Sequence, residues 1–278
     1  MMRLPALLFC LLLASAAEAQ TTVATWNIRM ASPGDGVNIW PNRKEKVAGL
    51  IREVNPDILC MQEVLNRQLI DLQYALPEYK WIAAGRDDGM KKGEAMPVFY
   101  RADRYNLLEF DHFWLSEQPD TPGLLGWDAA CPRIVTWVCL QERSSGDTLF
   151  VFNTHFDHVG TQAREMSATR IVEAADSLAG KYSTIITGDF NSTPQDPAYL
   201  TTVKAGFIDS RLASITKPVG PEYTFTGFDI SKKPGDRIDY VFIRNIHQVN
   251  SYLVRTDHSN GMYYSDHLPV IAEIRIKE

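Results

Sequence analysis

The sequence predicts one mixed α/β domain in which helices cover β-sheets. Its 278 residues, 45% hydrophobic and 22% charged, are too apolar for a disordered chain and too many for a disulfide-stapled miniprotein. Short β-branched and aromatic runs alternate with amphipathic segments, which favours sheets with helical cover over an all-β sandwich. No low-complexity linker and no short-period repeat divides the chain, so we expect a single domain.

The first residues are typical of a secretory signal peptide. Arg3 stands before an apolar run over residues 4–13, and Ala17-Glu18-Ala19 supplies small residues at a cleavage site. The run is shorter than the roughly 20 residues of a membrane-spanning helix, and no later segment reaches that length. We therefore expect a signal peptide over residues 1–19, a single domain over residues 20–278, no transmembrane segment, and export to the periplasm or the extracellular space.

Two helices and eight strands are predicted in the mature chain. Apolar residues recur at helical spacing between Asn42 and Pro56, and again between Thr161 and Gly180. Runs rich in β-branched and aromatic residues predict strands at 22–28, 57–61, 98–101, 134–140, 149–153, 184–187, 238–243 and 268–276.

Net charge and cysteine usage exclude several classes of protein. Lys and Arg number 28 against 34 Asp and Glu, which gives a net charge of −6. A nucleic-acid coat held by a basic face is therefore disfavoured, and a phosphate-bearing partner must be met locally by a cation or by a few arginines. The mature chain keeps Cys60, Cys131 and Cys139, an odd set without CxxC spacing that supports neither a disulfide scaffold nor a cysteine-built zinc site.

Polar side chains gather at the ends of six predicted strands. Carboxylates, amides and imidazoles are the groups that bind hard cations and move protons. If the strands share one sense, these groups form an oxygen-rich pocket at one end of the sheets. They are Asn27, Glu63, His155 with Asp157, Asp189 with Asn191, Asp239, and Asp266 with His267.

An ordered set of motifs resembles the endonuclease/exonuclease/phosphatase superfamily. The matching stretches are Thr25-Trp26-Asn27-Ile28-Arg29, Gln62-Glu63-Val64, Asn153-Thr154-His155, Gly188-Asp189-Phe190-Asn191, Arg237-Ile238-Asp239-Tyr240 and Ser265-Asp266-His267-Leu268-Pro269. Each is weak alone, but together they span the mature chain in family order. The resemblance implies a four-layer sandwich of two central sheets flanked by helices, and metal-dependent attack of water on a phosphoester.

The resemblance also assigns roles to individual residues. Glu63 is the principal ligand of Mg²⁺ or Mn²⁺, with Asn27 and Asp266 beside it. The alternative is that Glu63 caps a turn and Asn27 is a strand-end side chain.

Around the reacting phosphate, the resemblance implies that Asp189 and Asn191 place the attacking water and hold a phosphoryl oxygen or a second cation. An Asx-turn is their structural alternative. His267 faces the phosphorus and is oriented by Asp239, and the general base is left open between Asp189 and His267.

A second histidine belongs to the leaving group. In relatives of the deoxyribonuclease I, deadenylase and sphingomyelinase side, a histidine at the position of His155 protonates the departing oxygen. Glu94 resembles its partner, although a solvated charge after Lys91-Lys92 is the competing interpretation. Arg133 resembles an arginine used on substrate phosphate, for which a guanidinium offers a planar fork. A surface arginine at a strand start is the alternative.

The loop before Arg133 contains two tryptophans, Trp114 and Trp127, among prolines and glycines. It forms either a lid or base-stacking platform, or a plug in the core.

We predict that the protein is an exported phosphohydrolase, with a nuclease or nucleotide phosphodiesterase as the first choice. Sphingomyelinase-like, phosphoinositide or sugar phosphate hydrolysis is the alternative, although no aromatic hairpin or basic amphipathic stretch marks membrane docking. A catalytically silent binding domain is the rival from another class. We predict no stable protein partner, and the sequence leaves the number of metal ions and the oligomeric state open.

Overall fold

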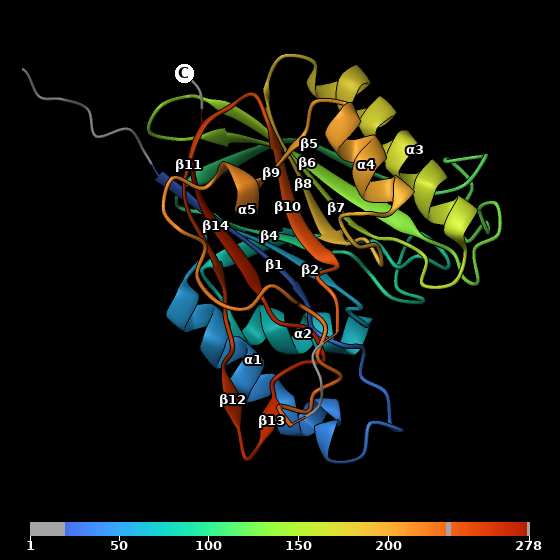
Figure 1. The fold of residues 1–278 in the computed structure, drawn as a ribbon, viewed down its shortest axis with the longest axis vertical. Helices are drawn as coiled ribbons and strands as arrows, with labels where there is room; N and C mark the ends of the chain where they lie inside the picture. Colours follow the sequence, from blue (N-terminus) through green and yellow to red (C-terminus); the bar gives the residue numbers. More distant parts are fainter. Residues whose placement is uncertain (1–19, 232–234, 277–278) are drawn as a thin grey trace, which may run out of the picture.

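A computed structural model describes residues 20–231 and 235–276 and shows two six-stranded sheets face to face, with helices on both outer sides (Figure 1). The first sheet has the order β11-β14-β1-β2-β4-β3 and the second β5-β6-β7-β8-β10-β9. The first contains β1 (Gln20–Asn27), β2 (Ile58–Gln62), β3 (Tyr79–Ile82), β4 (Val98–Arg101), β11 (Ile246–Val254) and β14 (Val270–Ile276). The second contains β5 (Tyr105–Trp114), β6 (Ile134–Glu142), β7 (Thr148–His155), β8 (Ser183–Asp189), β9 (Ile208–Asp209) and β10 (Asp239–Arg244).

Helices form the outer layers. The turn η1 (Gly36–Asn38) leads into α1 (Trp40–Val54), which lies with α2 (Asn66–Ala75) on the first sheet. On the second sheet lie α3 (Thr161–Ala179) and α4 (Pro197–Lys204), whereas the short α5 (Ser210–Ala213) contacts β10 and β11. A small hairpin of β12 (His258–Ser259) and β13 (Met262–Tyr263) completes the fold. The predicted four-layer sandwich is confirmed.

Three apolar layers hold the sandwich together. Side chains such as Val23 and Val138 fill the space between the sheets, and alternate residues of the same strands face the helices, as Trp26 does toward α1. Strands buried on both faces explain why the predicted runs are almost continuously hydrophobic. Burial of this kind contributes about 25 cal/mol per Å² of apolar surface.

All eight predicted strands overlap an observed strand, and both predicted helices are present. Helix α1 begins at Trp40 rather than Asn42, because Pro41 is well suited to the first turn of a helix. It ends at Val54, and the following Asn55 has a φ of 46°, the left-handed conformation common just after helix ends. The predicted signal peptide lies outside the described residues. Within the described part of the chain, no helix is long and apolar enough to cross a membrane.

Candidate active site

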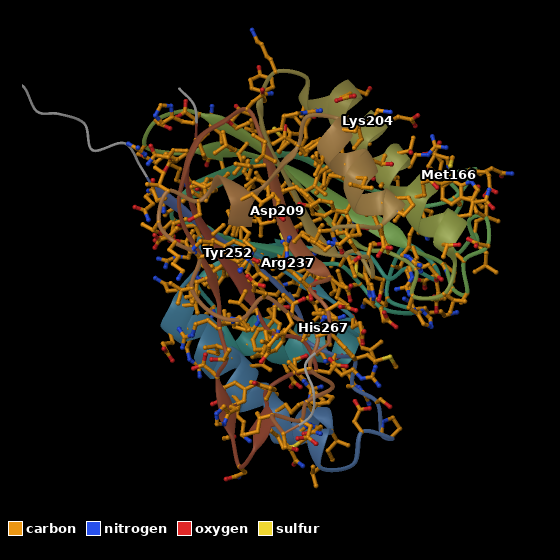
Figure 2. The ribbon with its side chains drawn as sticks, in the orientation of Figure 1. Met166, Lys204, Asp209, Arg237, Tyr252 and His267 are labelled. Atoms are coloured by element: carbon orange, nitrogen blue, oxygen red, sulfur yellow. The ribbon has the colours of Figure 1, made fainter. Side chains whose placement is uncertain are left out.

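The candidate site lies where corresponding ends of both sheets meet. Strands β1 and β2 are parallel, as are β7 and β8, so their carboxyl ends lie side by side. Strands β10 and β14 run antiparallel to β8 and β1 and begin at the same end. A cavity of about 380 Å³ opens there. In Figure 2 His267 marks this end of the sheets, with Arg237 and Asp209 above it.

The first sheet contributes three oxygen-bearing side chains. The Asn27 amide Nδ2 donates to Glu63 Oε1 at 3.0 Å, and Glu63 Oε2 accepts from the backbone N–H of Met30 at 3.0 Å. Glu63 has a φ of 61°, an uncommon left-handed conformation outside glycine and asparagine that tends to occur at functional sites. The Arg29 guanidinium lies 3.8 Å from Glu63 and 3.9 Å from Asp266. The carboxylates of Glu63 and Asp266 therefore share one positive neighbour.

Asp189, at the end of β8, connects the two halves of the site. Its Oδ2 accepts from the Asn27 amide at 3.0 Å and lies 3.4 Å from His155 Nε2 and 3.6 Å from His267 Nε2. The preceding Gly188 has a φ of 144° and no room for a Cβ atom, which would collide with the carbonyl oxygen of Thr154. Only glycine therefore lets β8 approach β7 closely enough to bring Asp189 beside His155.

His267 has a close carboxylate partner. Its Nδ1 lies 2.8 Å from Asp239 Oδ2, and both side chains are buried. Burial alone would lower the pKa of His267, but the negative charges of Asp239 and Asp189 outweigh that effect and raise the pKa well above its usual value. Burial raises the pKa of Asp189 to about 7, with Asp239 adding to the increase. Within this buried group the proton therefore belongs on the imidazole of His267.

His155 has a more distant partner. Its Nδ1 lies 3.9 Å from Glu94 Oε2, which is too far for a hydrogen bond, and Arg86 donates to both oxygens of Glu94 at 2.8 Å. His155 Nε2 accepts from the Asn191 amide at 3.1 Å. Burial and the positive charges of Arg133 and Arg86 lower the pKa of His155 well below its usual value. His155 is therefore neutral at neutral pH.

Arg133 lies in the wall of the same cavity and is buried rather than on the surface. Its Nε donates to Asp157 Oδ2 at 3.3 Å, and its Nη2 is 3.0 Å from His158 Nδ1. Its Nη1 is buried and has no hydrogen-bond partner among the residues that the structure describes. The Cys131, Asp157 and His158 ligand atoms lie within 4.8 Å of one another. Arg133 contacts both Asp157 and His158, so its positive charge disfavours a cation between Cys131, Asp157 and His158.

The residues at the other end of the cavity fit a hard divalent cation. Glu63, Asp189 and Asp266 all line the cavity. Burial and the neighbouring charge of Glu63 raise the pKa of Asp266, so a cation beside these carboxylates would favour their charged forms. Carboxylate oxygens are the ligands that Mg²⁺ and Mn²⁺ prefer. Asn27 turns its amide nitrogen toward Glu63 and Asp189, and its Oδ1 accepts from the Arg29 backbone.

The two tryptophans of the long loop differ in burial. Trp114 is 5% exposed, packs with Met96 and Ile134, and donates its indole N–H to the Arg86 carbonyl at 2.6 Å. Trp114 is thus a core plug that also fixes the backbone of Arg86. Trp127 is half-buried in the loop. The cysteines of the described chain, Cys60, Cys131 and Cys139, are all free.

The structure brings together the predicted site residues, and it adds residues that the sequence did not single out. Arg86 and Arg29 line the cavity, as does Phe225, whose ring meets the His267 ring edge-on with centroids 5.1 Å apart. The only sequence signal for Arg86 is that it is a positively charged residue eight positions before Glu94. Phe225 gives no signal, because a lone aromatic residue predicts core packing as readily as a site.

Fold and site together define a phosphoester hydrolase. Residues 24–267 match the Endonuclease/Exonuclease/phosphatase family, and the chain belongs to this family.

Individual relatives are similar over the whole domain. A family member from Bacteroides vulgatus is 38% identical with a TM-score of 0.89, covering 93% of this chain and 100% of that chain. A mannosyl-6-phosphatase of Bacteroides thetaiotaomicron is 35% identical with a TM-score of 0.88, covering 91% of this chain and 99% of that chain. The 3'-5'-exoribonuclease subunit Ccr4 of the CCR4-Not complex of Mycosarcoma maydis is 22% identical over 316 residues, covering 86% of this chain and 46% of that protein.

Proposed function

We propose that the protein is an exported, Mg²⁺- or Mn²⁺-dependent phosphomonoesterase that acts on sugar phosphates. One observation carries the proposal. A single cavity is lined by a carboxylate cluster around Glu63, by the half-buried Arg86 and the buried Arg133, and by His155 and His267. The carboxylates suit a cation that meets a phosphoryl group, and the arginines suit further anionic or hydroxyl oxygens of the substrate.

The arginine end of the cavity favours a terminal phosphate over a phosphate within a long chain. Behind Arg86, two loops pack against each other. Gly123 approaches the backbone of Asp87, and Gly89 packs on Trp114. In the proposed complex these loops bound the leaving-group side of the substrate, which favours a short leaving group such as one sugar unit. Similarity to the mannosyl-6-phosphatase supports the same substrate class.

The residues of the site supply positioning and proton transfer. A divalent cation held by Glu63 and Asp266 would neutralise charge on the phosphoryl group and the departing oxygen. His267, held by Asp239, presents a charged N–H toward a phosphoryl oxygen. Asp189 is then the better proton acceptor for the attacking water. The negative charge of a bound phosphate offsets Arg86 and Arg133, so His155 can gain the proton that it passes to the leaving oxygen.

A nuclease or nucleotide phosphodiesterase is the second candidate, and Phe225 favours it. This side chain is 39% exposed beside His267 and offers an aromatic face to a base. Stacking of one base contributes about 1–3 kcal/mol. The likeness to the exoribonuclease subunit Ccr4 supports this candidate as well.

A substrate panel tests the proposal. The panel contains mannose 6-phosphate, glucose 6-phosphate, single- and double-stranded DNA, RNA, sphingomyelin and phosphoinositides, each with Mg²⁺ and with chelator. We expect the highest kcat/KM on a sugar phosphate and loss of activity with chelator. Preferential cleavage of RNA or DNA would replace the proposal with the second candidate.

Glu63→Gln tests the cation site. The variant keeps the side-chain volume and removes the charge, so we expect a folded protein with weakened Mn²⁺ binding in calorimetry and most activity lost. Glu109→Gln, on the exposed part of β5, is the matched control. Undiminished turnover in Glu63→Gln would remove Glu63 from the site.

Export is tested by N-terminal sequencing of the protein from its native host. We expect a mature chain that starts near residue 20. A cytoplasmic protein that retains Met1 would contradict export.

A further inference from the structure

Arg43 is a buried arginine on α1 that lies beside the candidate cation site. Its side chain is 3% exposed. Its guanidinium donates four hydrogen bonds, to the carbonyl oxygens of Asn38 at 2.6 Å, Ile28 at 2.8 Å, Tyr264 at 3.0 Å and Arg29 at 3.1 Å. All four acceptors are main-chain carbonyls, whereas a buried arginine is ordinarily paired with a carboxylate.

Two of the loops that Arg43 joins carry predicted cation ligands. Ile28 and Arg29 follow Asn27, whose amide spans Glu63 and Asp189. Tyr264 precedes Ser265 and Asp266, and the Ser265 hydroxyl donates to the Asn27 carbonyl at 2.7 Å. One planar guanidinium thus ties the loop after β1 to the loop before β14.

Aromatic rings fix the guanidinium in this place. The Arg43 Cζ lies 5.5 Å from the Trp40 ring centroid and 5.2 Å from that of Phe228. The negative face of an aromatic ring attracts a guanidinium at such distances. The Trp40 indole is itself held by Asp71 at 2.8 Å. The cross-link between the two loops is therefore rigid.

From these contacts we infer that Arg43 is a positioning residue for the cation site, which sets the spacing between Asp266 and Glu63, the latter held to the loop after β1 by the Asn27 amide and the Met30 backbone N–H. The inference rests on the proposed cation site. A positive charge so near a bound cation would by itself repel it. Any benefit of Arg43 to cation binding must therefore come from the geometry of its hydrogen bonds, and this separates a positioning role from an electrostatic one.

The test compares Arg43→Lys and Arg43→Met in the full chain. Lysine keeps the positive charge but cannot donate to four separated carbonyls. Methionine removes both the charge and the hydrogen bonds. We expect the Kd for Mn²⁺, measured by calorimetry without substrate, to rise about 10–100-fold in both variants, as for partners that orient metal ligands. At saturating Mn²⁺, kcat should fall with little change in KM.

Arg52 provides the matched control on the same helix. It donates to the Ala75 carbonyl at 3.2 Å, away from the site loops, so Arg52→Lys and Arg52→Met should bind Mn²⁺ like the wild type. Tighter Mn²⁺ binding by Arg43→Met would overturn the inference, because it would show an effect of charge alone. Wild-type Kd and kcat in Arg43→Lys with only a lowered Tm would also overturn it. Absence of Mn²⁺ binding by the wild type would instead overturn the proposed cation site.

Discussion

The two histidines of the site share one neighbour but differ in their electrostatics. Both His155 and His267 are 5% exposed, and both lie near Asp189 Oδ2. The pKa of His267 is raised and that of His155 is lowered. Burial and the positive charges of Arg133 and Arg86 lower the pKa of His155, whereas at His267 the negative charges of Asp239 and Asp189 outweigh burial. Asp239 is 2.8 Å from His267, whereas the second carboxylate near His155, Glu94, is 3.9 Å away and is bound by Arg86.

This comparison teaches that a carboxylate favours a charged imidazole only if its own charge is not already compensated. Asp239 Oδ1 is buried and has no hydrogen-bond partner within residues 20–231 and 235–276, so the charge of Asp239 acts on His267. Both Glu94 oxygens accept from the Arg86 fork. Within one cavity, the charged form is therefore favoured at His267 and the neutral form at His155. We propose that the negative charge of bound substrate lets His155 gain its proton.

Asp189→Asn should have the largest effect, because it changes the group that both histidines share. We expect kcat to fall toward the upper end of the range of about 10²–10⁴ for lost proton-transfer groups. Steady-state kinetics with mannose 6-phosphate measures the loss. Asp176→Asn, at an exposed position of α3, is the control. Retention of most activity in Asp189→Asn would mean that Asp189 neither accepts a proton nor positions the attacking water.

His267→Ala should depress all phosphoester substrates alike. His267 is predicted to act on the phosphoryl group, which is common to every substrate, so kcat/KM should fall about 10²–10⁴-fold regardless of the leaving group. Asp239→Asn should reproduce part of this loss, since it removes the charge that holds the imidazole. A His267→Ala loss confined to poor leaving groups would assign His267 to the departing oxygen instead.

Removing the competitor of His155 should sharpen the comparison. In Arg86→Met the Glu94 carboxylate loses both hydrogen bonds from the guanidinium, and a positive charge near His155 is removed. The pKa of His155 should therefore rise toward its ordinary value of about 6.5. NMR titration of the His155 ring in the presence of chelator measures the change. Arg164→Met, on α3, is the matched control. An unchanged His155 titration in Arg86→Met would show that Arg86 does not compensate Glu94.

The opposite pKa shifts should also give opposite pH dependences of stability. His267 binds its proton more tightly in the folded state, so its contribution is complete below the unfolded pKa of about 6.5 and is lost as pH rises above it. His155 binds its proton less tightly when folded, so its contribution is complete above that pH and is lost as pH falls below it. Each histidine therefore gives one sloping limb of the curve of unfolding free energy against pH, His267 above about pH 6.5 and His155 below it. The slope of each limb is at most about 1.4 kcal/mol per pH unit.

Denaturant unfolding against pH, with chelator present, measures these limbs. His267→Gln should flatten the free energy of unfolding above about pH 6.5 and His155→Gln should flatten it below that pH. If both variants flattened the same limb, the assigned directions of the two pKa shifts would be contradicted.

The sequence predicts strand-end residues well because β-pairing brings such residues together. The parallel strands β1 and β2 end near Asn27 and Glu63, and the parallel strands β7 and β8 end at His155 and Asp189. The order of the motifs alone therefore predicts a cluster of polar side chains at one end of each sheet. Their chemical roles remain predictions. Arg86 and Arg43 could not be predicted, because their reach depends on how a loop and a helix pack, and neither stands at a spacing that marks a site.

The elements that the sequence analysis missed are mostly exposed or short. Strand β5 is an edge strand in which Leu108, Glu109 and Phe110 face solvent, so its pattern lacks the apolar run of a buried strand. Helix α2 has ten residues and three buried ones, which gives little periodicity. Strand β11 mixes buried, half-buried and exposed residues without regular alternation, and two register shifts interrupt its pairing.

The most direct test of the division of labour between the histidines is the leaving-group dependence of His155→Ala. His155 is predicted to protonate the departing oxygen, which matters for the alkoxide of mannose 6-phosphate and hardly at all for 4-nitrophenyl phosphate. We predict that kcat/KM falls about 10²–10⁴-fold on the sugar phosphate and far less on the nitrophenyl ester. Equal losses on both substrates would contradict this role and leave His155 as a phosphate contact or a structural residue.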